Sequence, residues 1–250
     1  THMTYLFKIA FSIKFIFIFL IGPSFNSYAK TISCDSKNVF SFIESENIKS
    51  VDIKTPKSKK WAKNYFKAFK SPGKTIVKKF KKKFDANLKI LFNNGLKCSF
   101  PAKIRISGDY KEHIGGSPPI ASLDIKLLAG NVNSIVRFKL FIPETKGSID
   151  EVFSTALLNE LGFLAPKTYL VPATFNDQKT IFLFQEKISK EFIESKNLRE
   201  APILEGDERF IYSDAIVRSV NTQTFDRLGL ARIVNKDWAT KGETSLNISK

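Results

Sequence analysis

One lysine and two glutamates have types and spacing suited to holding a phosphate chain. Lys139 lies in the middle of an alternating, strand-like run, on its less apolar side. Glu151 and Glu160 lie near opposite ends of the helical stretch that follows. A strand lysine can hold the phosphates of a nucleotide while a helix carboxylate holds that lysine in place. Glu151 and Glu160 are therefore candidate ion-pair partners of Lys139, and the alternative is a strand lysine that is merely solvated.

Short strands separated by polar turns must position these residues. A capping box formed by Ser148 and Glu151 predicts the start of a helix, and Gly162 can end it. The turn at 176–178 predicts a hairpin. Alternation of apolar and polar residues predicts six strands, at residues 88–92, 102–107, 122–128, 135–142, 168–175 and 179–185.

The order strand, helix, strand, strand, linker is that of a protein-kinase small lobe, although many α+β domains share it. The predicted fold class is α+β: a kinase-like small lobe of one antiparallel sheet and one helix, with an incomplete large lobe. A basic, largely helical region is expected before it. The predicted boundaries are a signal peptide over 1–29, the basic region over 30–100 and the kinase-like domain over 101–250.

Five pieces of the sequence carry a more specific similarity. They are Arg105–Asp109, Leu123–Leu127, Arg137–Leu140, Leu157–Thr168 and Phe182–Lys187. In the fourth piece a leucine-glycine pair closes the helix, and a proline, a basic residue and a threonine follow. In order and spacing these pieces resemble the CotH (spore-coat protein H) family of atypical secreted protein kinases. The resemblance covers a little under half of the chain.

The resemblance implies ATP-dependent phosphorylation of serine or threonine on exported protein substrates, with Mg or Mn as the divalent metal. By this resemblance Lys139 or Lys126 would approach the phosphates of ATP. The backbone around Gln185, Glu186 and Lys187 would line the adenine site. These five residues are the predicted cofactor-binding set.

The chain departs from the family after Glu186. The family's catalytic and metal-binding aspartates lie in the large lobe, and no segment after Glu186 matches the motifs that carry them. We therefore expect the catalytic residues to lie C-terminal to Lys250, in a longer natural protein. As it stands the chain is expected to be an inactive fragment, so whether it is an enzyme is left open.

The most basic part of the chain runs from residue 55 to residue 84, which holds twelve lysines and no acidic residue. Trp61, Tyr65 and Phe69 recur every four residues, which predicts a helix with these aromatic residues on one face and lysines opposite. The same aromatic spacing recurs after a Ser-Pro-Gly turn and predicts a helical hairpin. Its candidate anion-binding lysines are Lys59, Lys60, Lys63, Lys67, Lys78, Lys79 and Lys82.

This lysine-rich segment supports an alternative function. A formal net charge of +16 favours contact with an anionic surface. The alternative hypothesis is a non-catalytic binding protein of the cell envelope that uses the hairpin to contact an anionic polymer or a membrane. Nucleic acid is not expected as the partner. The plainer interpretation is a solvated face in a lysine-rich protein.

The N-terminus predicts export. Met3 is the only methionine and is taken as the natural start, with Thr1 and His2 as added residues. The apolar run over 15–22 is shorter than the roughly 20 residues that span a bilayer, and Ser27-Tyr28-Ala29 provides a signal-peptide cleavage site. The expected location is periplasmic, extracellular or envelope-associated. An uncleaved anchor is the alternative.

Two cysteines, Cys34 and Cys98, remain after the predicted cleavage. In an exported protein they can form one disulfide, and the sequence leaves this open. Two distant cysteines and two histidines give no ligand cluster, so no metal site is predicted.

Overall fold

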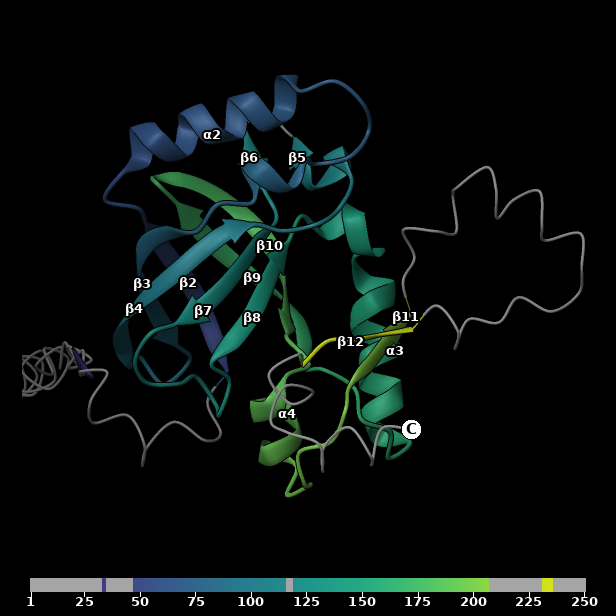
Figure 1. Cartoon of the computed structure of the whole chain (residues 1–250). Helices are drawn as coiled ribbons and strands as arrows, with labels where there is room; N and C mark the ends of the chain where they lie inside the picture. Colours follow the sequence, from purple (N-terminus) through teal and green to yellow (C-terminus); the bar gives the residue numbers. More distant parts are fainter. Residues whose placement is uncertain (1–32, 35–46, 116–118, 207–230, 236–250) are drawn as a thin grey trace, which may run out of the picture. The chain divides into compact units, whose positions relative to one another are not determined.

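The central feature of the structure is a curved sheet that closes on itself (Figure 1). The structure is a computed structural model, and it describes residues 33–34, 47–115, 119–206 and 231–235. The predicted signal peptide lies outside these residues. Seven strands form the ring in the order β4-β3-β2-β9-β10-β8-β7, and β7 pairs again with β4. Their bounds are β2 (Ile48–Lys54), β3 (Phe84–Phe92), β4 (Lys97–Ile106), β7 (Leu123–Leu127), β8 (Arg137–Phe141), β9 (Thr168–Phe175) and β10 (Gln178–Glu186).

One pairing in the ring is parallel, that of β2 with β9, and the other six are antiparallel. Strand direction cannot alternate all the way around a ring with an odd number of strands, so at least one neighbouring pair must be parallel. The end of this seam is fastened by Asn176, whose Oδ1 accepts hydrogen bonds from Thr55 N at 2.8 Å and Thr55 Oγ1 at 3.0 Å. Asn176 N donates to Ile53 O at 2.9 Å.

The interior of the ring is filled by alternate residues of its strands. In β3 and β4 every second residue is buried, as expected for strands with one face on a core. Phe138 stacks on Phe184 with ring centroids 4.7 Å apart, and Tyr169 stacks on the other side at the same distance. The ring is therefore a packed core, and its outward face carries polar side chains together with the buried Phe141 and Leu183.

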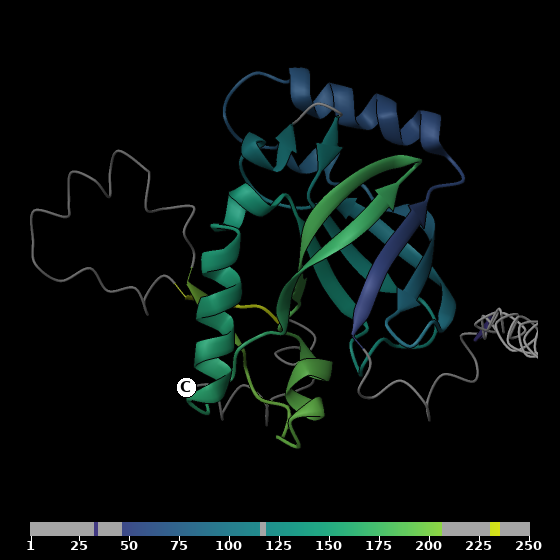
Figure 2. The same cartoon turned by 180° about the vertical axis from the view of Figure 1, so that it is seen from behind.

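Helix α2 (Ser58–Lys70) packs across one end of the ring (Figures 1 and 2). Its buried Trp61 meets Phe84 of β3 and Phe175 of β9 edge-on, both at 5.2 Å between ring centroids. Asn64 is also buried, and its Nδ2 donates to Phe80 O at 2.8 Å. Aromatic contacts with strands on both sides of the β2–β9 seam thus fix the helix on the ring.

The predicted helical hairpin is not present. After α2 the chain forms only one 3-10 turn, η2 (Lys78–Phe80), and Phe84 begins β3. The aromatic spacing that predicted a second helix arises because Phe84 packs on Trp61 from a strand. The described part of the 30–100 region is also not largely helical, since it contains β2, β3 and the start of β4.

The remaining elements confirm the α+β class. They include α3 (Ile149–Glu160), which joins β8 to β9, and a short α4 (Lys190–Ser195).

The ring, however, is not the sheet of a kinase small lobe, so that part of the predicted fold is wrong. The physical reason is the seam: β2 is not among the six strands that the sequence predicts, and its parallel pairing with β9 closes the sheet into a ring. Smaller elements are η3 (Lys111–His113), η4 (Pro143–Lys146) and the strand pairs β5 (Ile114–Gly115) with β6 (Ile120–Ala121) and β11 (Leu204–Gly206) with β12 (Ala231–Ile233).

Two local predictions have different outcomes. The hairpin at 176–178 is confirmed, because Asn176 and Asp177 both have positive φ between β9 and β10, as a two-residue turn of type I′ requires. The capping box is wrong. Ser148 has a φ of 53° and makes no side-chain cap, and the Glu151 carboxylate bonds to Gln185 instead. No helix in the described part of the chain is long and apolar enough to cross a membrane.

The cysteines lie at the edge of the ring. Strand β1 (Ser33–Cys34) pairs in parallel with the first two residues of β4, with Cys34 opposite Cys98. Cys98 is disulfide-bonded, and Cys34 is the only other cysteine in the chain.

We expect a bond between Cys34 and Cys98, and replacing each cysteine by alanine tests it. Cys34→Ala and Cys98→Ala should then lower the free energy of unfolding by similar amounts, about 2–4 kcal/mol, because either change opens the same loop. Urea unfolding of both variants, with and without reductant, measures this. A disulfide-linked dimer on a non-reducing gel, or a loss confined to Cys98→Ala, would contradict the pairing.

Gly108, which follows β4, is packed against the imidazole ring of His113. Gly108 has a φ of +88°, and a Cβ added there would lie 1.9 Å from Cδ2 of His113. His113 is buried, and its Nδ1 lies 3.0 Å from Ser122 Oγ, which also accepts a hydrogen bond from Ile142 N. Burial, then the charges of Lys146 and Lys139, lower the pKa of His113 to about 4, so the ring is neutral at pH 7.

Gly108→Ala should therefore destabilise the protein beyond the cost of a positive φ alone. Gly95→Ala is the matched control, since Gly95 has a φ of +85° and nothing within 4 Å of an added Cβ. We expect Gly108→Ala to lower the free energy of unfolding by about 1–3 kcal/mol more than Gly95→Ala, the usual cost of overpacking. Urea titrations of the two variants give this difference. Equal losses would show that His113 moves aside freely.

Candidate functional site

A row of polar residues crosses the outer face of the ring. Arg105 of β4 lies opposite Asp124 of β7, Asp124 opposite Lys139 of β8, and Lys139 opposite Gln185 of β10. Their neighbours along the strands, such as Ile125, are buried in the core. Because successive strand residues point to opposite faces, these four side chains share the outward face.

Asp124 is the anionic centre of this row. Its carboxylate is only 11% exposed and accepts a hydrogen bond from Arg105 Nε at 2.9 Å. Lys187 Nζ lies 3.7 Å from the same oxygen. Burial by itself would raise the pKa of Asp124, but the charges of Lys187 and Arg105 outweigh it and hold that pKa below its ordinary value. Asp124 is thus ionised at neutral pH and holds these two cations in place.

Helix α3 reaches the row through Glu151. Gln185 Nε2 donates a hydrogen bond to Glu151 Oε1 at 2.5 Å. Lys139, opposite Gln185 in register, places its Nζ 5.3 Å from the centre of the Phe141 ring. The structure therefore brings together Lys139, Gln185 and Lys187 of the predicted cofactor-binding set. The ion-pair candidate Glu151 joins them through its bond to the Gln185 amide.

Of the three remaining predicted residues, only Lys126 shares the outward face with the row. Glu186 is buried and faces the opposite side of β10 from Gln185, because neighbouring strand residues alternate. Lys126 is exposed and lies opposite Arg137, in the next outward register position from the Asp124–Lys139 pair. Glu160 is exposed at the far end of α3.

Glu186 belongs instead to the polar end of the core. Its Oε2 accepts a hydrogen bond from Lys167 N at 3.3 Å, and burial raises its pKa. Burial, with the nearby Glu186 carboxylate, also raises the pKa of Tyr169. The inward face at this end of β10 thus has a different character from the outward row.

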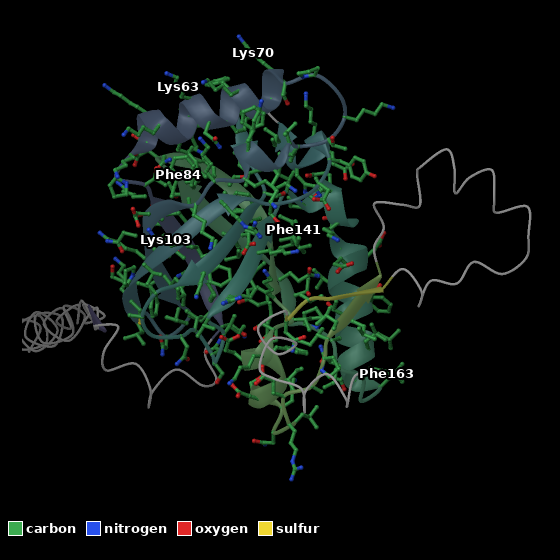
Figure 3. All side chains as sticks on the ribbon, viewed as in Figure 1. Lys63, Lys70, Phe84, Lys103, Phe141 and Phe163 are labelled. Carbon is green, nitrogen blue, oxygen red and sulfur yellow. The ribbon has the colours of Figure 1, made fainter. Side chains whose placement is uncertain are left out.

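The seven predicted anion-binding lysines are all exposed, four on α2 and three in or beside η2. Within α2, Lys63 and Lys70 extend away from the ring (Figure 3). No acidic residue occurs in the first turn of α2, where one would ordinarily favour the helix dipole. We call the following set the basic face: Lys59, Lys60, Lys63, Lys67, Lys78, Lys79 and Lys82.

The sequence pattern misplaced one aromatic residue of α2. The four-residue spacing predicts that Phe69 shares one face with Trp61 and Tyr65. Those two residues are buried, but Phe69 is 51% exposed, and Ala68 is buried in its place. At about 100° per residue, a position eight after Trp61 lies about 80° away from it around the helix, whereas Ala68 lies about 20° away. Phe66 is also exposed, so two aromatic rings share the outer surface of α2 with lysines.

The described residues also line a shallow pocket. A shallow pocket of about 370 Å³ is lined by Gly73, Lys74, Tyr110, Lys111 and Glu112, which are not among the predicted cofactor-binding residues. Within the described ranges no cluster of histidine, cysteine, aspartate or glutamate is placed to hold a metal ion.

Comparison with known protein families finds no family model that matches this chain. None of the curated proteins compared with it matches either.

Proposed function

We propose that this protein is an exported binding protein that contacts an anionic polymer or membrane of the cell envelope through the basic face. The observation that carries the proposal is that all seven lysines of that face are exposed, on a segment with no acidic residue between 55 and 84. Lysines that are not neutralised nearby give a positive potential that attracts polyanions.

The packing of α2 supports a rigid presentation of these charges. Trp61, Tyr65 and Ala68 are buried, so the helix cannot turn its lysines away without breaking the aromatic contacts with Phe84 and Phe175. At the other end of the helix, Lys111 Nζ donates to Phe69 O at 3.0 Å and to Ser71 O. A fixed array of like charges favours an extended anionic partner over a single small anion.

Charge reversal on α2 tests this function. The double substitution Lys63→Glu with Lys67→Glu should weaken binding to polyphosphate and to phosphatidylglycerol vesicles about tenfold or more, since each lysine near an anionic surface contributes about 1 kcal/mol. Binding is measured by co-sedimentation for vesicles and by calorimetry for polyphosphate, at several salt concentrations.

The matched control is Lys97→Glu with Lys179→Glu, which changes the net charge equally at two exposed strand lysines outside the basic face. This control should bind nearly as well as the natural sequence. An equal loss in both variants would mean that net charge alone matters and that α2 is not the contact surface.

A second candidate is the CotH-like kinase activity, in which this chain would supply part of an ATP site. It is favoured by the outward row, where Lys139 and Lys187 lie beside Asp124. Gln185 lies opposite Lys139, and Glu151 reaches Gln185 from α3. Lysines on a strand beside a fixed carboxylate are suited to holding phosphates, and Mg or Mn would accompany the nucleotide.

ATP binding separates this candidate from the first. Isothermal calorimetry with Mg-ATP and Mn-ATP should give saturable binding that Lys139→Ala weakens about tenfold, because a phosphate contact is lost. Lys179→Ala, at an exposed position far along β10 from the row, should leave binding unchanged. No saturable binding by the folded natural chain would rule out a nucleotide site in it.

A further inference from the structure

The outer surface of α2 carries exposed aromatic rings as well as lysines. Phe66 and Phe69 are 49% and 51% exposed, in a helix whose other exposed residues are mostly lysines. Tyr65 anchors both rings, edge-on to Phe66 at 5.4 Å and stacked with Phe69 at 6.4 Å. The two phenylalanines are therefore held in place on the surface by a buried neighbour.

Their position around the helix is specific. At about 100° per residue, Phe69, Ala62 and Phe66 occupy one uncharged flank between the buried face and the arc of lysines. Phe66 lies about 20° from Lys59 and about 40° from Lys70 in this projection. An apolar flank bordered by lysines is the pattern of a helix that lies in the interface of a membrane.

A soluble polyanion would not use this flank. It needs cations only, and it would leave both aromatic rings in water. The headgroup region of an anionic bilayer offers phosphates to the lysines and, a few ångströms deeper, an apolar layer for half-exposed rings. Lysine stems can reach along the surface to keep their charges at the phosphates.

The other exposed apolar helix differs in charge. Helix α3 exposes Phe153 at 66% along with Ile149 and Leu157, but its first turn carries Asp150 and Glu151 and its last turn carries no basic residue. An anionic surface would repel this helix. Among the described elements, α3 thus provides a control helix with a phenylalanine that is more exposed than Phe66 or Phe69.

We propose that α2 docks on an anionic phospholipid bilayer, with Phe66 and Phe69 inserted at the level of the upper acyl chains and the lysines of α2 at the lipid phosphates. This inference rests on the proposed function and deepens it, because it selects lipid over soluble polymer as the partner.

Site-specific tryptophan fluorescence tests the docking in the full chain. Phe66→Trp is compared with Phe153→Trp, and the signal of the natural sequence, which contains Trp61 and Trp238, is subtracted from both. With phosphatidylglycerol vesicles containing brominated acyl chains, the tryptophan at 66 should shift to shorter wavelength and be quenched at least twofold. The tryptophan at 153 should be quenched little. Residues 15–22 are common to both variants, so any effect of that apolar run appears in both.

Two further measurements distinguish docking on lipid from binding to a soluble polyanion. Adding Lys63→Glu and Lys67→Glu to the Phe66→Trp chain should abolish the quenching, as should vesicles of phosphatidylcholine alone. Lysine-dependent binding to polyphosphate without quenching at 66 would overturn the lipid inference and leave the proposed function standing. Equal quenching at 66 and 153 would overturn the assignment to α2. Binding to neither vesicles nor polyphosphate would overturn both.

Discussion

The parallel pairing of β2 with β9 is the constraint on which the rest of the structure depends. A ring of seven strands must contain a parallel pair, and this one joins the first ring strand to the second-last along the chain. Asn176 fastens the end of the seam to Thr55 and Ile53. Without the seam, the same strands would form an open sheet whose two edges each expose unpaired backbone groups.

Both candidate surfaces follow from this closure. Helix α2 is held by Trp61 between Phe84 and Phe175, which belong to strands on the two sides of the seam. The lysines and phenylalanines of its outer surface are thereby fixed in orientation. On the ring itself, Asp124 is the anionic centre of the outward row and holds Arg105 and Lys187.

Local patterns in the sequence predict much of this fold, but they do not predict which distant strands pair. The two-residue turn at Asn176 and Asp177 and the strands around it could be predicted because their signal is local. The seam could not, since nothing near 48–54 indicates a partner more than a hundred residues away. Strand alternation also separates two residues of the predicted cofactor-binding set. Gln185 and Glu186 are adjacent in sequence but lie on opposite faces of β10. The exposure of Phe69 could have been predicted from the 3.6-residue turn, which favours Ala68 for the buried position.

The seam also bears on how the chain can fold as it is synthesised. Thr55 and Asn176 are 121 positions apart, so β2, β3 and β4 emerge from the ribosome long before their closing partner exists. Contacts between such distant segments form slowly, because a long loop must be ordered before they stabilise anything. Until the hairpin of β9 and β10 arrives, the outer edge of β2 remains an open template for pairing with other chains. During that interval, pairing of β2 with another chain competes with closure of the chain's own ring.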